Sequence, residues 1–193
     1  MTADPTPTTA DRETALPSPR DVLVFWFDEL TPRDWFTRND DVDAAIVARF
    51  KALHEALAAE RPSEWTQGPE AFLALIIVLD QFPRNIWRGS AHAFATDPLA
   101  LSLSRRFRDE GFAEGLDDER KLFAYLPFEH SEVMADQEEA VRLLGALEGG
   151  YGEYAIKHRD VIERFGRFPH RNAALGRKNT REEQEWLDAG GGF

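Results

Sequence analysis

Residues 68–83 read GPEAFLALIIVLDQFP. Gly68-Pro69 indicates a helix start, because proline is favoured at the first helical position. Pro83 disfavours helix at the residue before it, so the apolar run is predicted to form a helix over 70–81. The nine apolar residues from Ala71 to Leu79 are too few to cross a bilayer, which takes about 20 in a helix. This stretch therefore predicts a helix buried in a protein core.

Seven further segments carry helix signals. Helix starts and apolar residues three or four apart predict helices over 18–30, 41–57, 96–110, 118–126, 131–147, 151–165 and 180–188. Asp41 and Ser131 are the expected N-caps of two of them, and Thr180–Glu183 is a capping box. Pro127 and Gly166 are expected to end two others. No stretch alternates with period 2 for long enough to predict a strand. We predict an all-α fold of about eight helices packed as antiparallel pairs.

The composition limits the classes of function. The chain has 193 residues, with 35 acidic and 23 basic side chains and a formal charge of −12. This acidic balance argues against binding to nucleic acid or to a membrane surface, because both favour a positive protein surface. The absence of cysteine excludes disulfides, thiol catalysis and cysteine-based metal sites. No phosphate-binding loop, dinucleotide fingerprint or nucleophile elbow occurs, and no cofactor is predicted.

The first 17 residues differ in composition from the rest of the chain. They are rich in Thr, Pro and Ala, and they have no apolar core. A secretory signal needs a basic start and a continuous apolar run, so a cytoplasmic protein is expected. We predict a flexible tail over 1–17 and a single helical domain over 18–193.

Three segments interleave polar and aromatic residues too tightly for an ordinary surface. They are the predicted loop segments 80–85, 127–132 (followed by Asp136-Gln137) and 164–172. Aromatic and proline side chains are expected to hold these segments against the core. Their neighbouring charges are then half-buried and need partners or a ligand.

Basic residues are concentrated over 156–181. This segment has eight basic and two acidic side chains, a local charge of +6, so the rest of the chain carries −18. In one interpretation, the arginines pair with carboxylates and hold the helices in register. The candidate carboxylates are Asp80, Glu129, Glu132 and Asp136. In the other, some arginines line a pocket and bind an anion bidentately. Both interpretations stay open, and they are compatible.

Histidines near carboxylates are the candidates for proton transfer. His130 adjoins Glu129, and His158 and His170 lie in the basic segment. Glu129, His130 and His170 are the predicted acid–base groups, since imidazole exchanges protons near neutral pH. No metal site is predicted, because neither H-E-x-x-H nor a histidine triplet at helical spacing occurs.

One short motif occurs twice. Phe82-Pro83-Arg84-Asn85 recurs as Phe168-Pro169-His170-Arg171-Asn172 with one residue inserted, and each copy follows a predicted helix. Coincidence between helix-ending loops would explain this repeat. The remaining histidines, His54 and His92, are expected to be surface or capping residues.

Several longer motifs resemble one known family. They are VLVFWF (22–27), LDQFPRNI (79–86), AFATDPLA (93–100), LPFEHSE (126–132) and RFGRFPHRN (164–172). In this order they resemble the uncharacterised bacterial family catalogued as domain of unknown function 924, over roughly residues 18–189. The resemblance implies an all-helical fold related to the right-handed tetratricopeptide-like superhelices. It implies no established activity.

Three functional hypotheses remain. In the first, a concave side of the helical array holds a small anion or the carboxylate of a peptide or metabolite. The candidate ligand-binding residues are Asp80, Arg84, Asn85, His158, Arg164, Arg167, Arg171 and Asn172. In the second, the protein is a small-molecule hydrolase or lyase that uses the Glu and His groups for proton transfer. In the third, it is a scaffold whose polar residues are all paired internally. Whether it is an enzyme stays open, as does formation of a homodimer.

Overall fold

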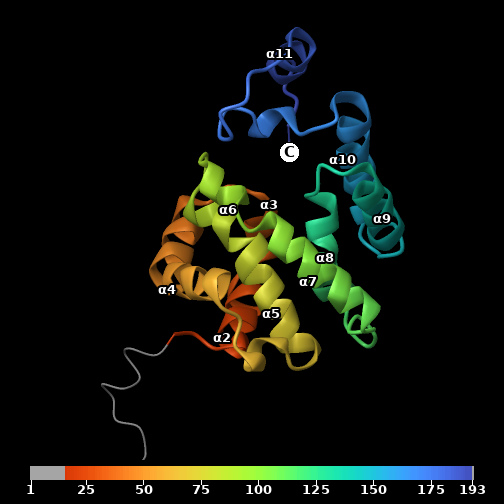
Figure 1. The fold of residues 1–193 in the computed structure, drawn as a ribbon. Helices are drawn as coiled ribbons and strands as arrows, with labels where there is room; N and C mark the ends of the chain where they lie inside the picture. Colours follow the sequence, from red (N-terminus) through yellow and green to blue (C-terminus); the bar gives the residue numbers. More distant parts are fainter. Residues whose placement is uncertain (1–15, 193) are drawn as a thin grey trace, which may run out of the picture.

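The computed structural model describes residues 16–192, and within that range it contains helices and no strand (Figure 1). The all-α prediction is therefore confirmed. Apart from residues 16 and 17, the predicted tail lies outside the described residues. The longer helices are α4 (Asp40–Ala59), α5 (Gly68–Asp80), α7 (Asp97–Asp109), α8 (Asp118–Glu129), α9 (Met134–Leu144), α10 (Tyr151–Phe165) and α11 (Arg181–Asp188). In the described part of the chain, no helix combines the length and apolarity needed to cross a membrane.

Shorter helical turns connect these elements. They are α2 (Pro19–Leu23), the π-helix η1 (Val24–Glu29), α3 (Pro32–Phe36), α6 (Phe82–Ile86) and the 3-10 turns η2 (Ser63–Thr66), η3 (Ala91–Phe94) and η4 (Pro169–Arg171). Each of the eight predicted helices has a counterpart between residues 16 and 192, whereas α3 and α6 were not predicted.

α5 is the central helix. Every residue from Phe72 to Asp80 is buried, and α5 packs against α2, α4, α7 and α8. Figure 1 shows α2 and α4 on one side of it and α7 and α8 on the other, followed by α9 and α10. A helix that is apolar all round is stable only when it is surrounded in this way. Because Asp80 ends this helix, its carboxylate is buried too and needs polar partners.

Aromatic rings join the N-terminal segment to this core. Leu30 N–H donates to Phe25 O at 3.2 Å, which is the spacing of a π-turn. The turn brings Phe25 and Trp26 inward. The Trp26 ring lies with its centroid 5.7 Å from that of Phe82 and 5.2 Å from that of Phe123. Aromatic pairs at such separations contribute about 0.5–1.5 kcal/mol beyond their buried area.

Two predicted N-caps are each wrong by two residues. α4 begins at Asp40 and is capped by the side chain of Asn39, not by Asp41. α9 begins at Met134 after Val133, whereas Ser131 donates its hydroxyl to Asp136 Oδ2 at 2.7 Å. The first error arises because Asn39, Asp40 and Asp41 are adjacent and all can cap a helix. The capping box at Thr180 and the left-handed Gly166 after α10 are confirmed.

Two further corrections affect the site. Pro127 does not end α8, which continues to Glu129, and His130 N–H donates to Leu126 O at 3.0 Å. A proline removes only its own N–H from the helix, and the burial of residues 122–129 holds the rest in place. The segment 80–85 is not a loop. Gln81 keeps a helical conformation and α6 follows it, with Pro83 in the first turn, where its missing N–H is not needed.

Candidate functional site

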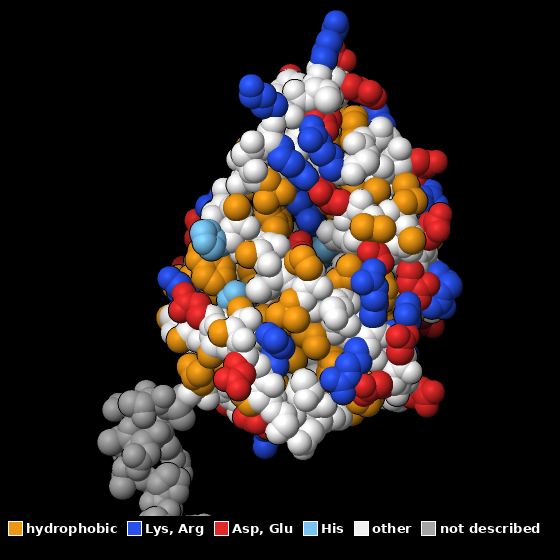
Figure 2. Space-filling model, in the orientation of Figure 1, with side chains coloured by type: hydrophobic (Ala, Val, Ile, Leu, Met, Phe, Trp, Pro, Cys, Tyr) orange, Lys and Arg blue, Asp and Glu red, His pale blue; other side chains and the backbone are white. Residues whose placement is uncertain are grey.

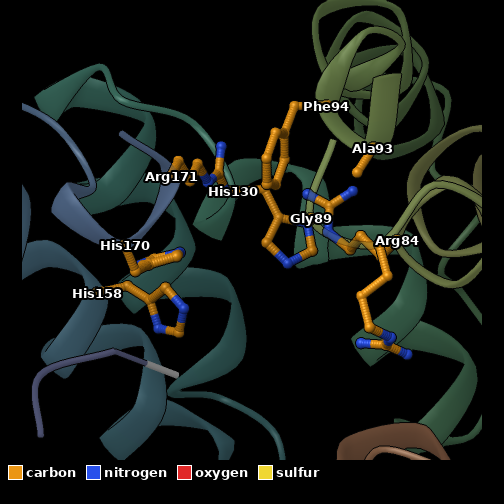
Figure 3. A pocket seen from close by; sticks show the side chains of 9 residues that line it. Arg84, Gly89, Ala93, Phe94, His130, His158, His170 and Arg171 are labelled. Carbon is orange, nitrogen blue, oxygen red and sulfur yellow. The ribbon is translucent and has the colours of Figure 1, made fainter. Parts of the chain in front are cut away.

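A pocket of about 300 Å³ lies between the two copies of the Phe-Pro motif. The polar and aromatic side chains that line it are Arg84, Arg88, Phe94, His130, His158, His170 and Arg171. Figure 3 shows His158 and His170 on one side of the pocket and Arg84 on the other. In Figure 2, Lys and Arg side chains gather around a hollow with a histidine visible inside it. Residues from α6, η3, α8, α10 and η4 therefore share one cavity.

Asp97, at the start of α7, joins the two copies of the motif. Arg84 donates to both of its carboxylate oxygens, at 3.0 and 3.2 Å, and Arg171 donates to Oδ2 at 3.2 Å. Each copy forms a short helical turn with a proline at its start. One arginine from each copy of the motif, Arg84 and Arg171, therefore binds the same carboxylate, that of Asp97. In the sequence, Asp97 looks like an ordinary helix-start residue, so no local signal identifies this role.

Asp80 supports the pocket from the interior. It is 0% exposed and accepts hydrogen bonds from His130 Nδ1 at 2.9 Å and Gln81 Nε2 at 2.5 Å. Its Oδ1 lies 3.6 Å from a guanidinium nitrogen of Arg84. Burial by itself would raise the pKa of Asp80, but the charge of Arg84 and the hydrogen bonds lower it to about 2. Asp80 is therefore a carboxylate at neutral pH.

The histidines of the pocket are neutral at neutral pH. Burial lowers the pKa of His158 to about 3 and that of His170 to about 4. Burial and the nearby charge of Arg84 lower the pKa of His130. His158 Nδ1–H donates to the backbone oxygen of Tyr154 at 2.9 Å. Since neutral imidazole carries one proton, the Nε2 atom of His158 is an acceptor.

Glu129 is buried behind His158. Its Oε1 lies 3.4 Å from His158 Nδ1. Burial and the negative charge of Asp80 raise the pKa of Glu129 to about 8, so this carboxyl group is protonated at neutral pH. The predicted acid–base group thus has a perturbed pKa, but it is not among the side chains that line the pocket.

The Arg171 guanidinium has N–H groups that donate to no described residue. Its side chain is buried, 7% exposed, and its guanidinium carbon lies 4.7 Å from the Phe94 ring centroid and 4.6 Å from that of Phe168. Burial lowers its pKa to about 10, so it stays charged at neutral pH. Its hydrogen bond to a described residue is the one to Asp97, and its buried Nε–H has no acceptor among residues 16–192. Its Nη2 also donates to no described residue and is not among the fully buried polar atoms, so Nη2 is the donor that a ligand in the pocket can reach.

Besides Asp80, four of the predicted ligand-binding residues lie outside the pocket lining and bond to other protein groups. The pairs are Asn85 with Asp43, Arg164 with Glu182, Arg167 with Glu183, and Asn172 with Asn179. Arg164 and Arg167 thus form the ion pairs of the pairing interpretation, but with acids of α11 and not with the carboxylates proposed. Of the four carboxylates proposed as partners, Glu132 is bound bidentately by an arginine of the basic segment, Arg177, at 2.8 and 2.9 Å.

The expectation that His54 is a surface residue is wrong. It is 5% exposed, and its Nε2 lies 3.3 Å from Thr96 Oγ1. His54 follows Phe50 by four residues and precedes Leu57 by three, so the helical period already placed it on the inner face of α4. His92 is exposed, as expected.

The described side chains include no group of three or more His, Asp or Glu that could hold a metal ion.

Comparisons with known proteins identify relatives of unknown function. A family model described as bacterial protein of unknown function (DUF924) matches residues 22–191. The solved structure of a protein of unknown function, ATU0120 from Agrobacterium tumefaciens, has a TM-score of 0.84 and 41% sequence identity, covering 89% of this chain and 97% of that one. No curated protein matches the chain. The family model covers most of the sequence, and the chain belongs to the bacterial DUF924 family of proteins of unknown function.

Proposed function

We propose that the pocket binds a small anionic molecule through a carboxylate or a comparable oxyanion. The observation that carries this proposal is the Arg171 guanidinium on the pocket wall, whose Nη2 donates to no described residue and, unlike Nε, is not fully buried. A hydrogen bond to a charged group contributes about 1.5–3 kcal/mol, and an oxyanion of the ligand would accept it.

The surroundings of Arg171 favour binding of a small planar group. The rings of Phe94 and Phe168 hold the plane of the guanidinium, so little side-chain freedom is left to lose on binding. Arg84 is occupied by Asp97 and Asp80, and it acts mainly as a positive charge at the pocket wall. The cavity of about 300 Å³ is at the lower end of ligand-pocket sizes, which favours a metabolite over a folded partner.

Replacing Arg171 with glutamine is expected to weaken binding of small carboxylates about 10–100-fold, because a charge-assisted hydrogen bond contributes about 1.5–3 kcal/mol. Isothermal titration calorimetry with a panel of small carboxylates and inorganic phosphate measures this. The matched control is Arg164→Gln, since Arg164 belongs to the same basic segment but pairs with Glu182 at the surface. Absence of binding to the whole panel, or an equal loss in both variants, would contradict the proposal.

A second candidate function is acid–base catalysis in the same pocket, as a hydrolase or lyase. It is favoured by the buried Asp80–His130 pair, because a carboxylate that orients an imidazole is a recurrent general-base arrangement. A broad substrate screen tests it. An activity that survives the single replacement of His130, His158 and His170 would reject this mechanism.

The family resemblance suggests a right-handed tetratricopeptide-like superhelix. We also propose a single domain, which the length of the chain favours, and a cytoplasmic location. The C-terminal carboxylate of a peptide is an alternative anion, and a second copy of the chain is an alternative partner.

A further inference from the structure

The hydrogen bond that holds His130 also determines which ligand groups its exposed edge can meet. The carboxylate of Asp80 can only accept, so the proton on the His130 ring is on Nδ1. A neutral ring carries no second proton, and its Nε2 therefore has a lone pair. His130 lines the pocket, and its Nε2 has no hydrogen-bond partner among the described residues. His130 Nε2 is therefore a hydrogen-bond acceptor on the wall of the pocket.

This acceptor stands beside the cationic part of the pocket. His130 Nδ1 and a guanidinium nitrogen of Arg84 approach the same oxygen of Asp80, at 2.9 and 3.6 Å. Arg84 in turn shares Asp97 with Arg171. A ligand whose oxyanion reaches Arg171 therefore places its neighbouring atoms within the same small cavity as His130.

We propose that the ligand is a small hydroxycarboxylate, whose carboxylate accepts from Arg171 Nη2 and whose hydroxyl group donates to His130 Nε2. This inference rests on the proposed anion-binding function and specifies its ligand class. A hydroxyl is the group that fits, because it is a neutral donor and the atom it meets is an acceptor.

Other common substituents fit less well. An ammonium group would also donate to Nε2, but it would bring a positive charge next to Arg84 and Arg171. A hydrogen atom in place of the hydroxyl would leave Nε2 without a donor. A fully ionised phosphate presents only acceptors, which the lone pair of Nε2 repels.

Two ligand series that differ in one substituent test the inference on the full-length protein. The first is lactate, propionate and alanine, and the second is malate, succinate and aspartate, with hydroxyl, hydrogen and ammonium at the same carbon. The hydroxy acid of a series is expected to bind about tenfold or more tightly than its two analogues. Carboxylates that bind without a preference for the hydroxyl would overturn this inference and leave the proposed function intact. No binding to either series would overturn both.

The preference is expected to disappear in His130→Asn. Asparagine can still donate an amide N–H towards Asp80, but it lacks the atom that faces the pocket as Nε2. The matched control is His92→Asn, because His92 is exposed and is not among the lining residues. A hydroxyl preference that persists in His130→Asn would show that another group recognises the hydroxyl, contrary to the inference.

A measurement on the wild-type protein covers the case in which His130→Asn does not fold. Nitrogen-15 NMR of histidine-labelled protein at pH 7 reports which ring nitrogen of His130 carries the proton. We expect a protonated Nδ1, an unprotonated Nε2, and a change of the Nε2 signal on titration with the hydroxy acid. A proton on Nε2, or no change at saturating ligand, would reject the role of His130.

Discussion

Replacing Asp80 with alanine is expected to lower the free energy of unfolding by about 3–5 kcal/mol, the usual cost of removing one partner of a buried ion pair. The substitution leaves His130 Nδ1–H without its acceptor and removes one of the two carboxylates near Arg84. Both groups also line the pocket, but Asp80 beneath them is 0% exposed, so its loss leaves them without an acceptor on their buried side. Urea denaturation at pH 7, monitored by circular dichroism, measures the change.

Asp160→Ala is the matched control for this experiment. Asp160 lies on the exposed face of α10 and pairs with Arg159 at the surface, so its loss is expected to cost less than about 1 kcal/mol. If Asp80→Ala is no less stable than this control, the buried carboxylate does not organise the pocket wall as described.

Glu129→Gln is expected to become more stable relative to the wild type as the pH rises. The pKa of Glu129 is about 8 in the folded protein, above its ordinary value of 4.5. The stability linked to its proton is therefore fully present below pH 4.5 and is lost as the pH rises through 8. The loss approaches about 1.4 kcal/mol per pH unit in this window. Glutamine resembles the protonated side chain and does not titrate, so the variant avoids this loss. Urea denaturation at several pH values from about 5 to 8 measures the difference.

The buried histidines are expected to change the stability with pH in the opposite direction to Glu129. The pKa values of His158 and His170, about 3 and 4, lie below their ordinary value of 6.5. Their contribution is present above pH 6.5 and is lost as the pH falls towards these values. This acid loss is expected in the wild type and in Glu129→Gln alike. Glu153→Gln, at an exposed position of α10, should follow the wild type at every pH. Parallel curves for the wild type and Glu129→Gln would contradict the protonated state of Glu129.

Much of the helical layout was predictable because helix signals are local. The run 71–79, the capping box at Thr180 and the glycine stop at Gly166 each involve residues within a few positions of one another. The prolines were less reliable. Pro83 and Pro127 were interpreted as helix breakers, but one stands in a first turn and the other is held inside a buried helix. In both places packing around the proline outweighs its local preference.

Some of the residues that line the pocket were predictable from the sequence. Interleaved aromatic and polar residues marked the segments that contain Arg84, His130 and Arg171, and the structure places these three side chains on one cavity. The same pattern also marked Arg164 and Arg167, which pair with acids of α11 instead. Composition alone does not separate a ligand-facing arginine from a paired one, because the two differ only in which acids lie within reach.

Residue order alone accounts for the all-helical class, the course of the long helices and the family, since each depends on periodicity, caps and contiguous motifs. The contacts that make the pocket depend on how the helices pack. Asp97 binds Arg84 and Arg171, and Asp80 binds His130, across separations of 13, 74 and 50 residues. These partners meet because α5, α7, α8 and η4 converge at one end of a shared core, and no short-range pattern encodes which ends converge.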